Sequence, residues 1–386
     1  MKIRSQYSSQ LGRTYRTFAR RKNWFLQQAS VGTAKNFSMA TSAYLSKRIK
    51  LSSLPVALKV DISPVCNLRC PFCIHGTTDP KKRIFNKRQR ITVADFQRLV
   101  NEVKGRTSAM SLYYLGDPLT HPDLTELCAV ANEGKIYTYV STNFSFQLSD
   151  EKIEDLATCG LSHLKICVDG LTQEIYGRTR VGGRIETVIN NLKRVCEART
   201  RLKSKLVVEV QYILNDDNRH QVDECRELME KIGVDEMTTF EGADYTMEEI
   251  HPKNFEVLGP AKSGVIPNCF WPYYFMTVKW NGDVIPCCSF RQDEQYDSAN
   301  KTERLLGNIF ETSVEEVWNS QAYQNARRFV TNPAKFMNEE NGESEFCYGC
   351  KRVCSRRKAG LSFKPEAAPQ AMPLDPTALP VLRPTG

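Results

Sequence analysis

The sequence has no long apolar run. No stretch of its 386 residues approaches the roughly 18 consecutive apolar residues that a membrane-spanning helix needs, so we expect no membrane span. No short apolar segment with a small-residue cleavage site opens the chain, which argues against a secretory signal. With 41% hydrophobic and 25% charged residues, the composition is that of a soluble protein, and we expect a cytoplasmic location.

Acidic residues are absent from the first 60 positions. Twelve Lys or Arg lie in this segment and Asp61 is the first acid, so the net charge of +9 comes from the N-terminus. We expect residues 1–56 to form a basic helical arm. The arm is either a solvated or docking face or a site for an anionic partner, such as a membrane surface, a nucleic acid or a phosphorylated substrate. Targeting peptides have a similar composition.

Strand and helix signals alternate over residues 57–245. Runs rich in Val, Ile, Tyr and Thr predict strands at 57–63, 109–115, 137–142, 163–169, 206–214 and 235–240. Intervening segments predict helices at 92–103, 124–132, 149–158, 184–198 and 221–232. This alternation predicts an α/β fold with a parallel sheet and right-handed crossovers. Six units are fewer than the eight of a closed barrel, so we expect a partial TIM-like barrel whose ligands gather at the carboxyl ends of its strands.

The alternation stops near residue 245. Residues 246–361 are rich in cysteine and predict a small C-terminal domain, with a hairpin of strands 275–280 and 283–286 turning at Asn281-Gly282. A helical stretch is expected at 313–330. Residues 362–386 are rich in proline, and we expect them to form a disordered tail.

Fourteen cysteines are many for a chain with no sign of secretion. A disulfide framework is typical of small secreted domains, whereas clustered cysteines in an intracellular enzyme indicate a metal site. Nine of them form three local groups: Cys66, Cys70 and Cys73; Cys269, Cys287 and Cys288; and Cys347, Cys350 and Cys354. The other five stand singly, and we expect them to be small core residues.

The first group places three thiols within eight residues, directly after the first predicted strand. Soft thiolates select iron–sulfur clusters or zinc. A [4Fe–4S] cluster normally takes four cysteines, so Cys66, Cys70 and Cys73 would leave one iron for a non-protein ligand. His75 could instead complete a Cys3His zinc site, although zinc sites usually combine a close cysteine pair with a distant second pair.

The spacing Cys-x3-Cys-x2-Cys, with the aromatic Phe72 before the third cysteine, resembles the radical S-adenosylmethionine (SAM) superfamily. The resemblance implies that the free iron binds SAM, whose reductive cleavage gives a 5′-deoxyadenosyl radical that abstracts hydrogen from a substrate C–H bond. It also implies an external electron donor such as flavodoxin or ferredoxin.

Three further segments at predicted strand ends resemble SAM-contacting segments of this family. Gly-Asp-Pro follows the second strand, where the family more often has Gly-Glu-Pro. Ser-Thr-Asn follows the third strand, and Asp-Gly with Arg-Val-Gly-Gly follows the fourth. The resemblance implies SAM contacts from Gly116, Asp117, Ser141, Asn143, Asp169 and Arg180. It identifies no catalytic acid or base.

The C-terminal cysteines resemble the SPASM or shorter twitch extension of radical SAM enzymes, which holds auxiliary [4Fe–4S] clusters. The resemblance implies one auxiliary cluster on Cys269, Cys287, Cys347 and Cys350, with zinc on the same thiols as the alternative. Neighbouring side chains in a strand point to opposite faces, so Cys288 is not expected to share a cluster with Cys287. Cys288 and Cys354 are either packing residues or ligands of a second cluster.

The extension also resembles that of 2-deoxy-scyllo-inosamine dehydrogenase. This resemblance implies oxidation of a polar small molecule, such as a sugar or aminocyclitol, with the auxiliary cluster accepting an electron. The alternatives are a SPASM peptide-modifying enzyme, a radical SAM epimerase, and a non-enzymatic zinc or electron-transfer module. Residues 1–56 look short for the winged-helix domain that peptide-modifying relatives often carry.

Overall fold

The computed structural model describes most of the chain. It describes residues 27–77, 88–241, 255–257, 266–285, 305–333 and 355–357, together with residues 23, 86, 287, 335, 336 and 347. The proline-rich segment 362–386 lies outside the described residues, as do Cys288, Cys350 and Cys354.

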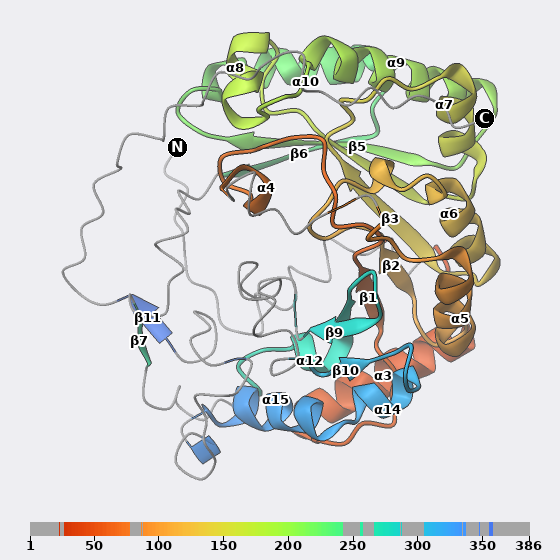
Figure 1. The fold of residues 1–386 in the computed structure, drawn as a ribbon, viewed down its shortest axis with the longest axis vertical. Helices are drawn as coiled ribbons and strands as arrows, with labels where there is room; N and C mark the ends of the chain where they lie inside the picture. Colours follow the sequence, from red (N-terminus) through yellow and green to blue (C-terminus); the bar gives the residue numbers. More distant parts are fainter. Residues whose placement is uncertain are drawn as a thin grey trace.

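A curved sheet of nine strands, in the order β10-β9-β8-β1-β2-β3-β4-β5-β6, runs through the molecule (Figure 1). Its strands are β1 Ala57–Val60, β2 Ala109–Ser111, β3 Tyr137–Thr142, β4 His163–Cys167, β5 Val207–Leu214, β6 Glu236–Glu241, β8 Phe275–Val278, β9 Asp283–Ile285 and β10 Gly307–Asn308. Neighbouring strands from β1 to β6 are parallel, so the six predicted strands and the α/β partial barrel are confirmed. A separate antiparallel pair joins β7 Phe255–Val257 to β11 Ser355–Arg357.

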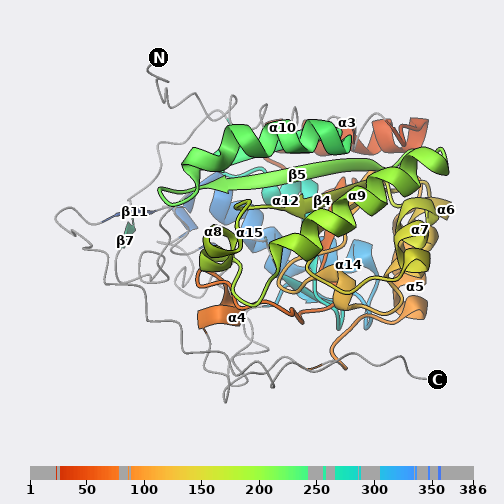
Figure 2. The same ribbon diagram turned by 90° about the horizontal axis from the view of Figure 1, so that it is seen from above.

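Most of the helices cover the convex side of the sheet, whereas the short α4 lies on its concave side (Figures 1 and 2). The helices are α3 Val31–Leu45, α4 Ile74–Thr77, α5 Val93–Val103, α6 Leu124–Glu133, α7 Asp150–Thr158, α8 Gln173–Thr179, α9 Ile185–Arg201, α10 Val222–Ile232, α12 Trp271–Tyr274, α14 Val314–Trp318 and α15 Gln321–Thr331, with short 3-10 turns at Pro118–Thr120 and Arg219–Gln221. The five helices predicted between the strands are present, and α8 is an additional one. None of the helices in the described part of the chain is long and apolar enough to cross a membrane.

The predicted C-terminal helix is divided in two. The sequence pattern suggested one helix over 313–330, but α14 ends at Trp318 and α15 begins at Gln321. The hydroxyl of Ser320 accepts a hydrogen bond from the Tyr323 amide and so starts a new helix. The break brings Trp318 and Tyr323 into edge-to-face contact, 4.6 Å apart.

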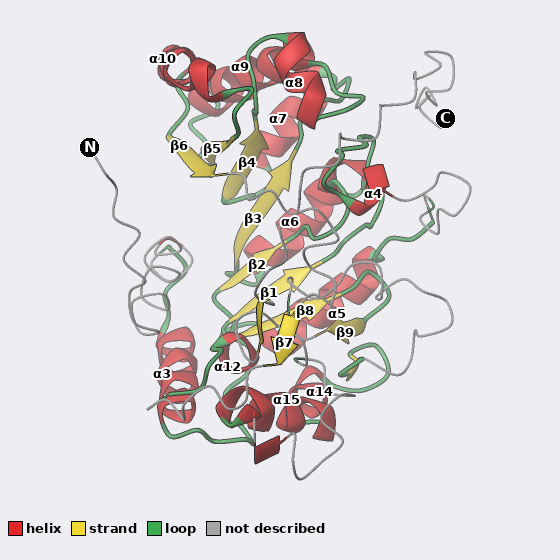
Figure 3. Ribbon diagram, turned by 90° about the vertical axis from the view of Figure 1, so that its left-hand side faces the viewer, coloured by secondary structure: helices red, strands yellow, loops and turns green. Residues whose placement is uncertain are grey.

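The C-terminal hairpin extends the barrel sheet. Strand β8 pairs with β1 in parallel, Ala57 opposite Phe275, and β9 pairs with β8 antiparallel. The predicted turn is confirmed, because Gly282 has the positive φ of +86° that glycine adopts without strain. Figure 3 shows β8 and β9 beside β1, on the side of the sheet opposite β6. The boundaries predicted for the separate domains, 57–245 and 246–361, remain predictions.

Helix α3 ties the N-terminal segment to the rest of the fold. The Asn36 side chain donates to the carbonyls of Leu54 and Arg106 and accepts from the Leu54 amide, all at 2.9–3.0 Å. The Tyr44 hydroxyl donates to the Pro267 carbonyl at 3.1 Å. This part of the predicted arm is therefore a structural helix, while contact of the arm with an anionic partner stays a prediction.

Candidate active site and auxiliary cluster site

Cys66, Cys70 and Cys73 lie in the loop between β1 and α4, as the sequence predicted. Cys70 is buried and the other two are half-buried. The amide of Leu68 donates to the sulfur of Cys66 at 3.4 Å. A side chain at Gly76 would place its Cβ 2.1 Å from the Cys70 carbonyl oxygen, so glycine is needed to fold the loop back on itself. The loop thus holds three thiols on a tightly folded backbone.

Burial raises the pKa of all three thiols, that of Cys70 to about 11, whereas the positive charge of Arg180 opposes this rise at Cys70 and Cys73. A metal replaces the thiol proton and holds the sulfur as thiolate. One buried and two half-buried thiols near an arginine are therefore a donor set suited to a thiolate-ligated cluster, and they fit three irons of a [4Fe–4S] group.

The zinc alternative lacks its fourth ligand. The Nε2 atom of His75 lies 3.2 Å from the Leu115 carbonyl oxygen, so the ring bonds to the backbone of the next strand's loop. In the described residues, no three or more Cys, His, Asp or Glu gather closely enough for a single metal ion. In a [4Fe–4S] cluster each thiolate binds a different iron, so its ligands need not crowd around one ion.

Asp117 lies buried between the loop after β2 and the end of β3. Its carboxylate accepts hydrogen bonds from the Thr142 hydroxyl at 2.9 and 3.0 Å, the Asn143 amide at 2.7 Å, the Asn143 side chain at 2.6 Å and the Leu119 amide at 3.0 Å. Burial raises the pKa of Asp117 to about 6 against the opposing effect of these bonds. A Cβ at Gly116 would lie 2.2 Å from the Ser63 carbonyl oxygen, so glycine permits this close approach. Asp117 thus acts as a positioning residue.

Asn143 connects this carboxylate to the cysteine loop. Its side-chain amide lies 2.9 Å from the Asn67 side-chain oxygen and 3.9 Å from the Cys66 sulfur. Ser141, two residues earlier on β3, places its hydroxyl 3.9 Å from the Cys167 sulfur at the end of β4. The Ser-Thr-Asn segment therefore faces the thiols, as its position at a strand end predicted.

Asp169 and Arg180 form a buried ion pair beside the same loop. The Arg180 Nε atom lies 2.6 Å from the Asp169 carboxylate, which also accepts from the Ile213 amide at 2.9 Å. The guanidinium lies 5.8 Å from the centre of the Phe72 ring and also bonds to Cys70. The six predicted SAM contacts therefore surround the cysteine loop, and their contact with SAM stays a prediction.

Tyr176 is a site residue that the sequence did not single out. Its side chain is fully buried, and its hydroxyl has no hydrogen-bond partner among the described residues. The charges of Arg180 and Asp169 and the thiols of Cys70 and Cys167 all act on it. An orphaned hydroxyl beside the thiols is consistent with a ligand that fills this part of the site. No sequence pattern distinguishes it from a core tyrosine.

The concave face of the sheet carries a second group of residues, of which Glu209, Lys165 and His163 were not identified from the sequence. On β5, Val208 and Val210 are fully buried in the core, while the alternating Glu209 and Gln211 face the other side. The Glu209 carboxylate contacts Lys165 at 3.0 Å, His163 at 2.9 Å, the Tyr139 hydroxyl at 3.1 Å and the Thr238 hydroxyl at 2.5 Å. The sequence of a parallel strand that is buried on both faces is usually a continuous run of apolar residues. The alternating polar residues of His163–Cys167 were the signal that could have identified this face.

Glu209 is ionised within this group. Burial alone would raise its pKa, but the close contact with His163 and the positive charge of Lys165 lower the pKa of Glu209 to about 2. Lys165 also donates to the Gln211 side chain at 3.0 Å. The concave face therefore offers a carboxylate, an ammonium group and an amide within a few ångströms of one another.

Three of the four predicted auxiliary ligands lie in the described residues. Cys269, Cys287 and Cys347 are all half-buried, and Cys350 lies outside the described residues. The Trp271 amide donates to the Cys269 sulfur at 3.4 Å, the same arrangement that Leu68 makes with Cys66. Such N–H···S bonds tune thiolate-ligated clusters.

Tyr323 of α15 joins this region. Its pKa is raised by burial and further by the thiols of Cys287 and Cys347, which places both cysteines near its ring. Helix α12, which follows Cys269, packs against α15. The predicted thiols from the hairpin and the later loop therefore converge on the same pair of helices.

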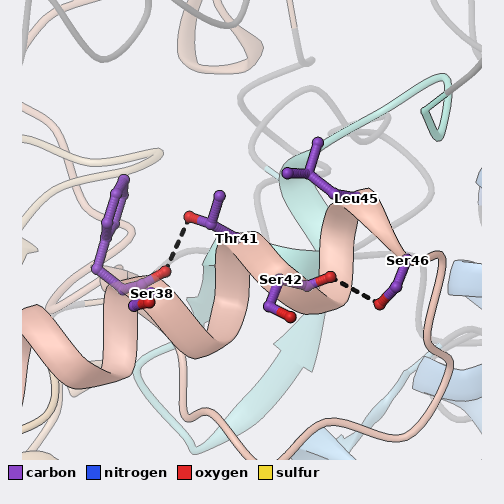
Figure 4. Close-up of a pocket in the computed structure, with 6 residues that line it drawn as sticks. Ser38, Thr41, Ser42, Leu45 and Ser46 are labelled. Carbon is purple, nitrogen blue, oxygen red and sulfur yellow. Dashed lines mark hydrogen bonds between the residues drawn. The ribbon is translucent and has the colours of Figure 1, made fainter.

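A hollow on the surface of α3 does not belong to either site. It is lined by Phe37, Ser38, Thr41, Ser42, Leu45 and Ser46. Figure 4 shows two of its hydroxyls bonded to the helix's own carbonyls, Thr41 to Phe37 and Ser46 to Ser42. No thiol or titratable group lines it among the described residues.

The fold and the two thiol groups define an α/β partial-barrel enzyme of the iron–sulfur class. The chain belongs to the radical SAM superfamily: the model of that superfamily matches residues 60–229, and the model of the SPASM iron–sulfur cluster-binding domain matches residues 269–351. Its cofactors are accordingly a SAM-binding [4Fe–4S] cluster, SAM and an auxiliary [4Fe–4S] cluster.

Similar proteins catalyse different reactions. A probable GTP 3′,8-cyclase of Archaeoglobus fulgidus is 27% identical over 44% of this chain and 53% of its own length. A tungsten-containing aldehyde ferredoxin oxidoreductase cofactor-modifying protein of Pyrococcus furiosus is 21% identical over 71% and 83%. A PqqA peptide cyclase of Gluconobacter oxydans is 24% identical over 48% of each. The chain thus spans about half the length of the two cyclases.

Solved structures support the fold. The structure of Streptococcus suis SuiB bound to its precursor peptide SuiA superimposes with a TM-score of 0.54 at 16% identity, covering 82% of this chain and 80% of SuiB. The SAM-bound form of SuiB gives a TM-score of 0.53. At this identity the likeness shows a shared architecture.

Proposed function

We propose that this radical SAM enzyme is an oxidoreductase that oxidises a polar small molecule, such as a sugar or an aminocyclitol. The observation that carries the proposal is the charged concave face of the sheet. There the Lys165 ammonium lies 3.0 Å from the Glu209 carboxylate and 3.0 Å from the Gln211 side-chain oxygen. A hydroxyl group both donates and accepts a hydrogen bond, so a carboxylate beside an ammonium group can hold it in one orientation.

This arrangement favours a hydroxyl-bearing substrate. A site built to bond a hydroxyl leaves its own buried polar groups unpaired when an apolar analogue enters, and so discriminates strongly against that analogue. Tyr139, whose ring lies 5.5 Å from the Lys165 ammonium, supplies an apolar surface beside these groups. Both features support a compact polar substrate.

Cys66, Cys70 and Cys73 would hold the first cluster, which with SAM would supply the chemistry for removing one hydrogen atom from the substrate. One proton and one electron would then have to leave to complete a two-electron oxidation. In this proposal the substrate hydroxyl, whose proton leaves, replaces one of the hydroxyl donors that the ionised Glu209 now accepts from, Tyr139 or Thr238. The auxiliary site, with Cys269 and Cys287 among its ligands, is the proposed destination of the electron.

An epimerase is a second candidate, favoured by the position of Cys167. Its thiol lies at the carboxyl end of β4, 3.9 Å from the Ser141 hydroxyl. Burial raises its pKa, which keeps the sulfur protonated. A thiol in this place could return a hydrogen atom to a substrate radical from the opposite face, the thiyl radical then taking an electron and a proton from the external donor and solvent.

The first experiment uses the anaerobically reconstituted full-length enzyme with SAM and a low-potential reductant in D2O. Sugars and aminocyclitols are compared with peptides of matched concentration. We expect a hydroxyl compound to increase 5′-deoxyadenosine formation and to yield a product two hydrogen atoms lighter. A product with the substrate's formula except for one solvent deuterium, and therefore one mass unit heavier than the substrate, would favour the epimerase if it is lost in Cys167→Ala. Stimulation by peptides alone would contradict both.

The matched control is the variant in which Cys66, Cys70 and Cys73 are all replaced by Ala. We expect it to form no 5′-deoxyadenosine, because it cannot hold the first cluster, and to keep the iron of the auxiliary cluster, which has its own ligands. Chromatography of the reaction mixture measures 5′-deoxyadenosine, and iron analysis with electron paramagnetic resonance measures the auxiliary cluster. Residual 5′-deoxyadenosine would contradict the ligand assignment.

A further inference from the structure

Arg327 is a fully buried cation of the C-terminal region. It lies on α15 with no exposed surface, and its guanidinium donates to three backbone carbonyls: Pro272 at 3.0 Å, Ile49 at 2.9 Å and Trp318 at 2.7 Å. Among the described residues, no carboxylate pairs with it. Burial lowers the pKa of Arg327 to about 10, so the group stays charged at neutral pH.

A buried charge without a counter-charge is costly. Removing an ion from water carries a penalty of several kcal/mol, which carbonyl dipoles offset only in part. The aromatic rings of Trp318 and Tyr323 lie 4.6 and 5.1 Å from the guanidinium and add cation–π attraction, but they carry no net charge. The surroundings of Arg327 therefore suit a cation that has an anionic neighbour when the protein is complete.

The thiolate-ligated auxiliary cluster would bring negative charge to the region of Arg327. Arg327 bonds to Pro272 in α12, three residues after the ligand Cys269. On its other side it contacts Tyr323, which is influenced by the thiols of Cys287 and Cys347. Helices α12 and α15 lie side by side in Figures 1 and 3. Tyr323 thus contacts the guanidinium and also lies within the electrostatic influence of these two thiols.

The hydroxyl of Tyr323 is the second observation. It is completely buried and has no hydrogen-bond partner in the part of the chain that the structure describes. Buried hydroxyls are nearly always bonded, so an orphaned one beside two cysteines fits a cluster sulfur as its acceptor. Arg327 and Tyr323 thus present one positive charge and one donor toward the auxiliary site.

We propose that Arg327 and the Tyr323 hydroxyl are positioning residues that raise the reduction potential of the auxiliary cluster and so make it an electron acceptor. A cluster with four thiolate ligands carries a net negative charge, which grows by one when it takes up an electron. Nearby positive charge and hydrogen bonds to sulfur stabilise the reduced form more than the oxidised form. The inference rests on the proposed role of this cluster in accepting the substrate's electron.

The test measures the auxiliary cluster alone. The full-length chain with Cys66, Cys70 and Cys73 replaced by Ala is reconstituted, and its redox titration is followed by electron paramagnetic resonance. We expect Arg327→Gln to lower the reduction equilibrium constant at least tenfold, which is about 59 mV for a one-electron couple. Arg328→Gln, which removes the same charge from the adjacent position, should change it much less. Equal potentials in Arg327→Gln and the parent would overturn the inference.

Tyr323→Phe keeps the test decisive if Arg327→Gln does not fold. It removes one oxygen atom and leaves the ring in place, so we expect a stable protein with a lower potential. An unchanged potential in this variant would also overturn the proposal. The titration contains no substrate, so its outcome does not depend on the reaction. If the variants shift the potential but the activity assay yields no oxidised small molecule, the proposed function is contradicted and the inference about the cluster stands.

Discussion

At the scale of single residues, the buried carboxylate of Asp117 connects the loop after β2 to the end of β3. It bonds to Thr142, Asn143 and Leu119, and Asn143 in turn reaches the cysteine loop through Asn67. The sequence comparison suggested direct contact of this carboxylate with SAM. Its hydrogen bonds suggest a further role, which is to fix the end of β3 beside the thiols.

We expect Asp117→Asn to destabilise the protein and weaken SAM binding. The amide nitrogen would face donors of Asn143 or Thr142, leaving at least one buried donor unsatisfied at a cost of about 1–3 kcal/mol. Chemical denaturation and SAM-binding calorimetry measure the two effects. The control is Asp123→Asn, because Asp123 at the start of α6 makes no side-chain capping bond. Equal stability and SAM affinity in the two variants would show that Asp117 has no positioning role.

At the scale of elements, α3 shows how the N-terminal segment is attached. The helix begins at a capping box in which Ser30 and Thr33 bond to each other's backbone amides. Its inner face carries Asn36 and Tyr44, whose polar groups reach backbone atoms far along the chain. The helix is thereby fixed by specific hydrogen bonds as well as by packing.

We expect Asn36→Ala to lower the free energy of unfolding by about 3 kcal/mol, because it leaves the buried carbonyls of Leu54 and Arg106 and the Leu54 amide without their partner. Lys35→Ala, at the exposed neighbouring position, should change it by less than about 0.5 kcal/mol. Urea unfolding compares the two. A small effect of Asn36→Ala would mean that α3 can detach without loss of the core.

At the scale of the whole molecule, the barrel and the hairpin of the auxiliary region share one sheet. The Val56 and Asp61 amides bond to Tyr274 and Val278, at either end of the β1–β8 ladder. The buried core is likewise continuous from α3 through the barrel strands to α15. This continuity gives the two cluster sites a common rigid support.

We therefore expect β1 and β8 to unfold in one cooperative step. In native-state hydrogen exchange of the reconstituted protein with increasing denaturant, amides of residues 57–60 and 275–278 should converge on one opening free energy, because each strand supplies half of the same hydrogen bonds. Earlier opening of 275–278 would show that the auxiliary region is an independent unit.

The sequence by itself determined the elements and the thiol loop. Strand and helix periods depend on neighbouring residues, so the starts of β1–β6 were predicted to within one residue, although β1 and β2 end three and four residues earlier than predicted. The local spacing of Cys66, Cys70 and Cys73 was enough to indicate the first cluster. Glycine turns such as Asn281-Gly282 are equally local. The family match confirmed the reading of these local patterns.

Only the tertiary structure decided which distant residues meet. No local pattern places β8 beside β1, because that pairing joins residues more than 200 positions apart. The charged concave face required the register of three strands, which brings Lys165, Glu209 and Thr238 together. In the sequence, Arg327 is indistinguishable from an exposed charge on an amphipathic helix. In the folded protein it is buried against Trp318 and Tyr323. Burial and long-range contact are properties of the folded chain, and they give these side chains their chemistry.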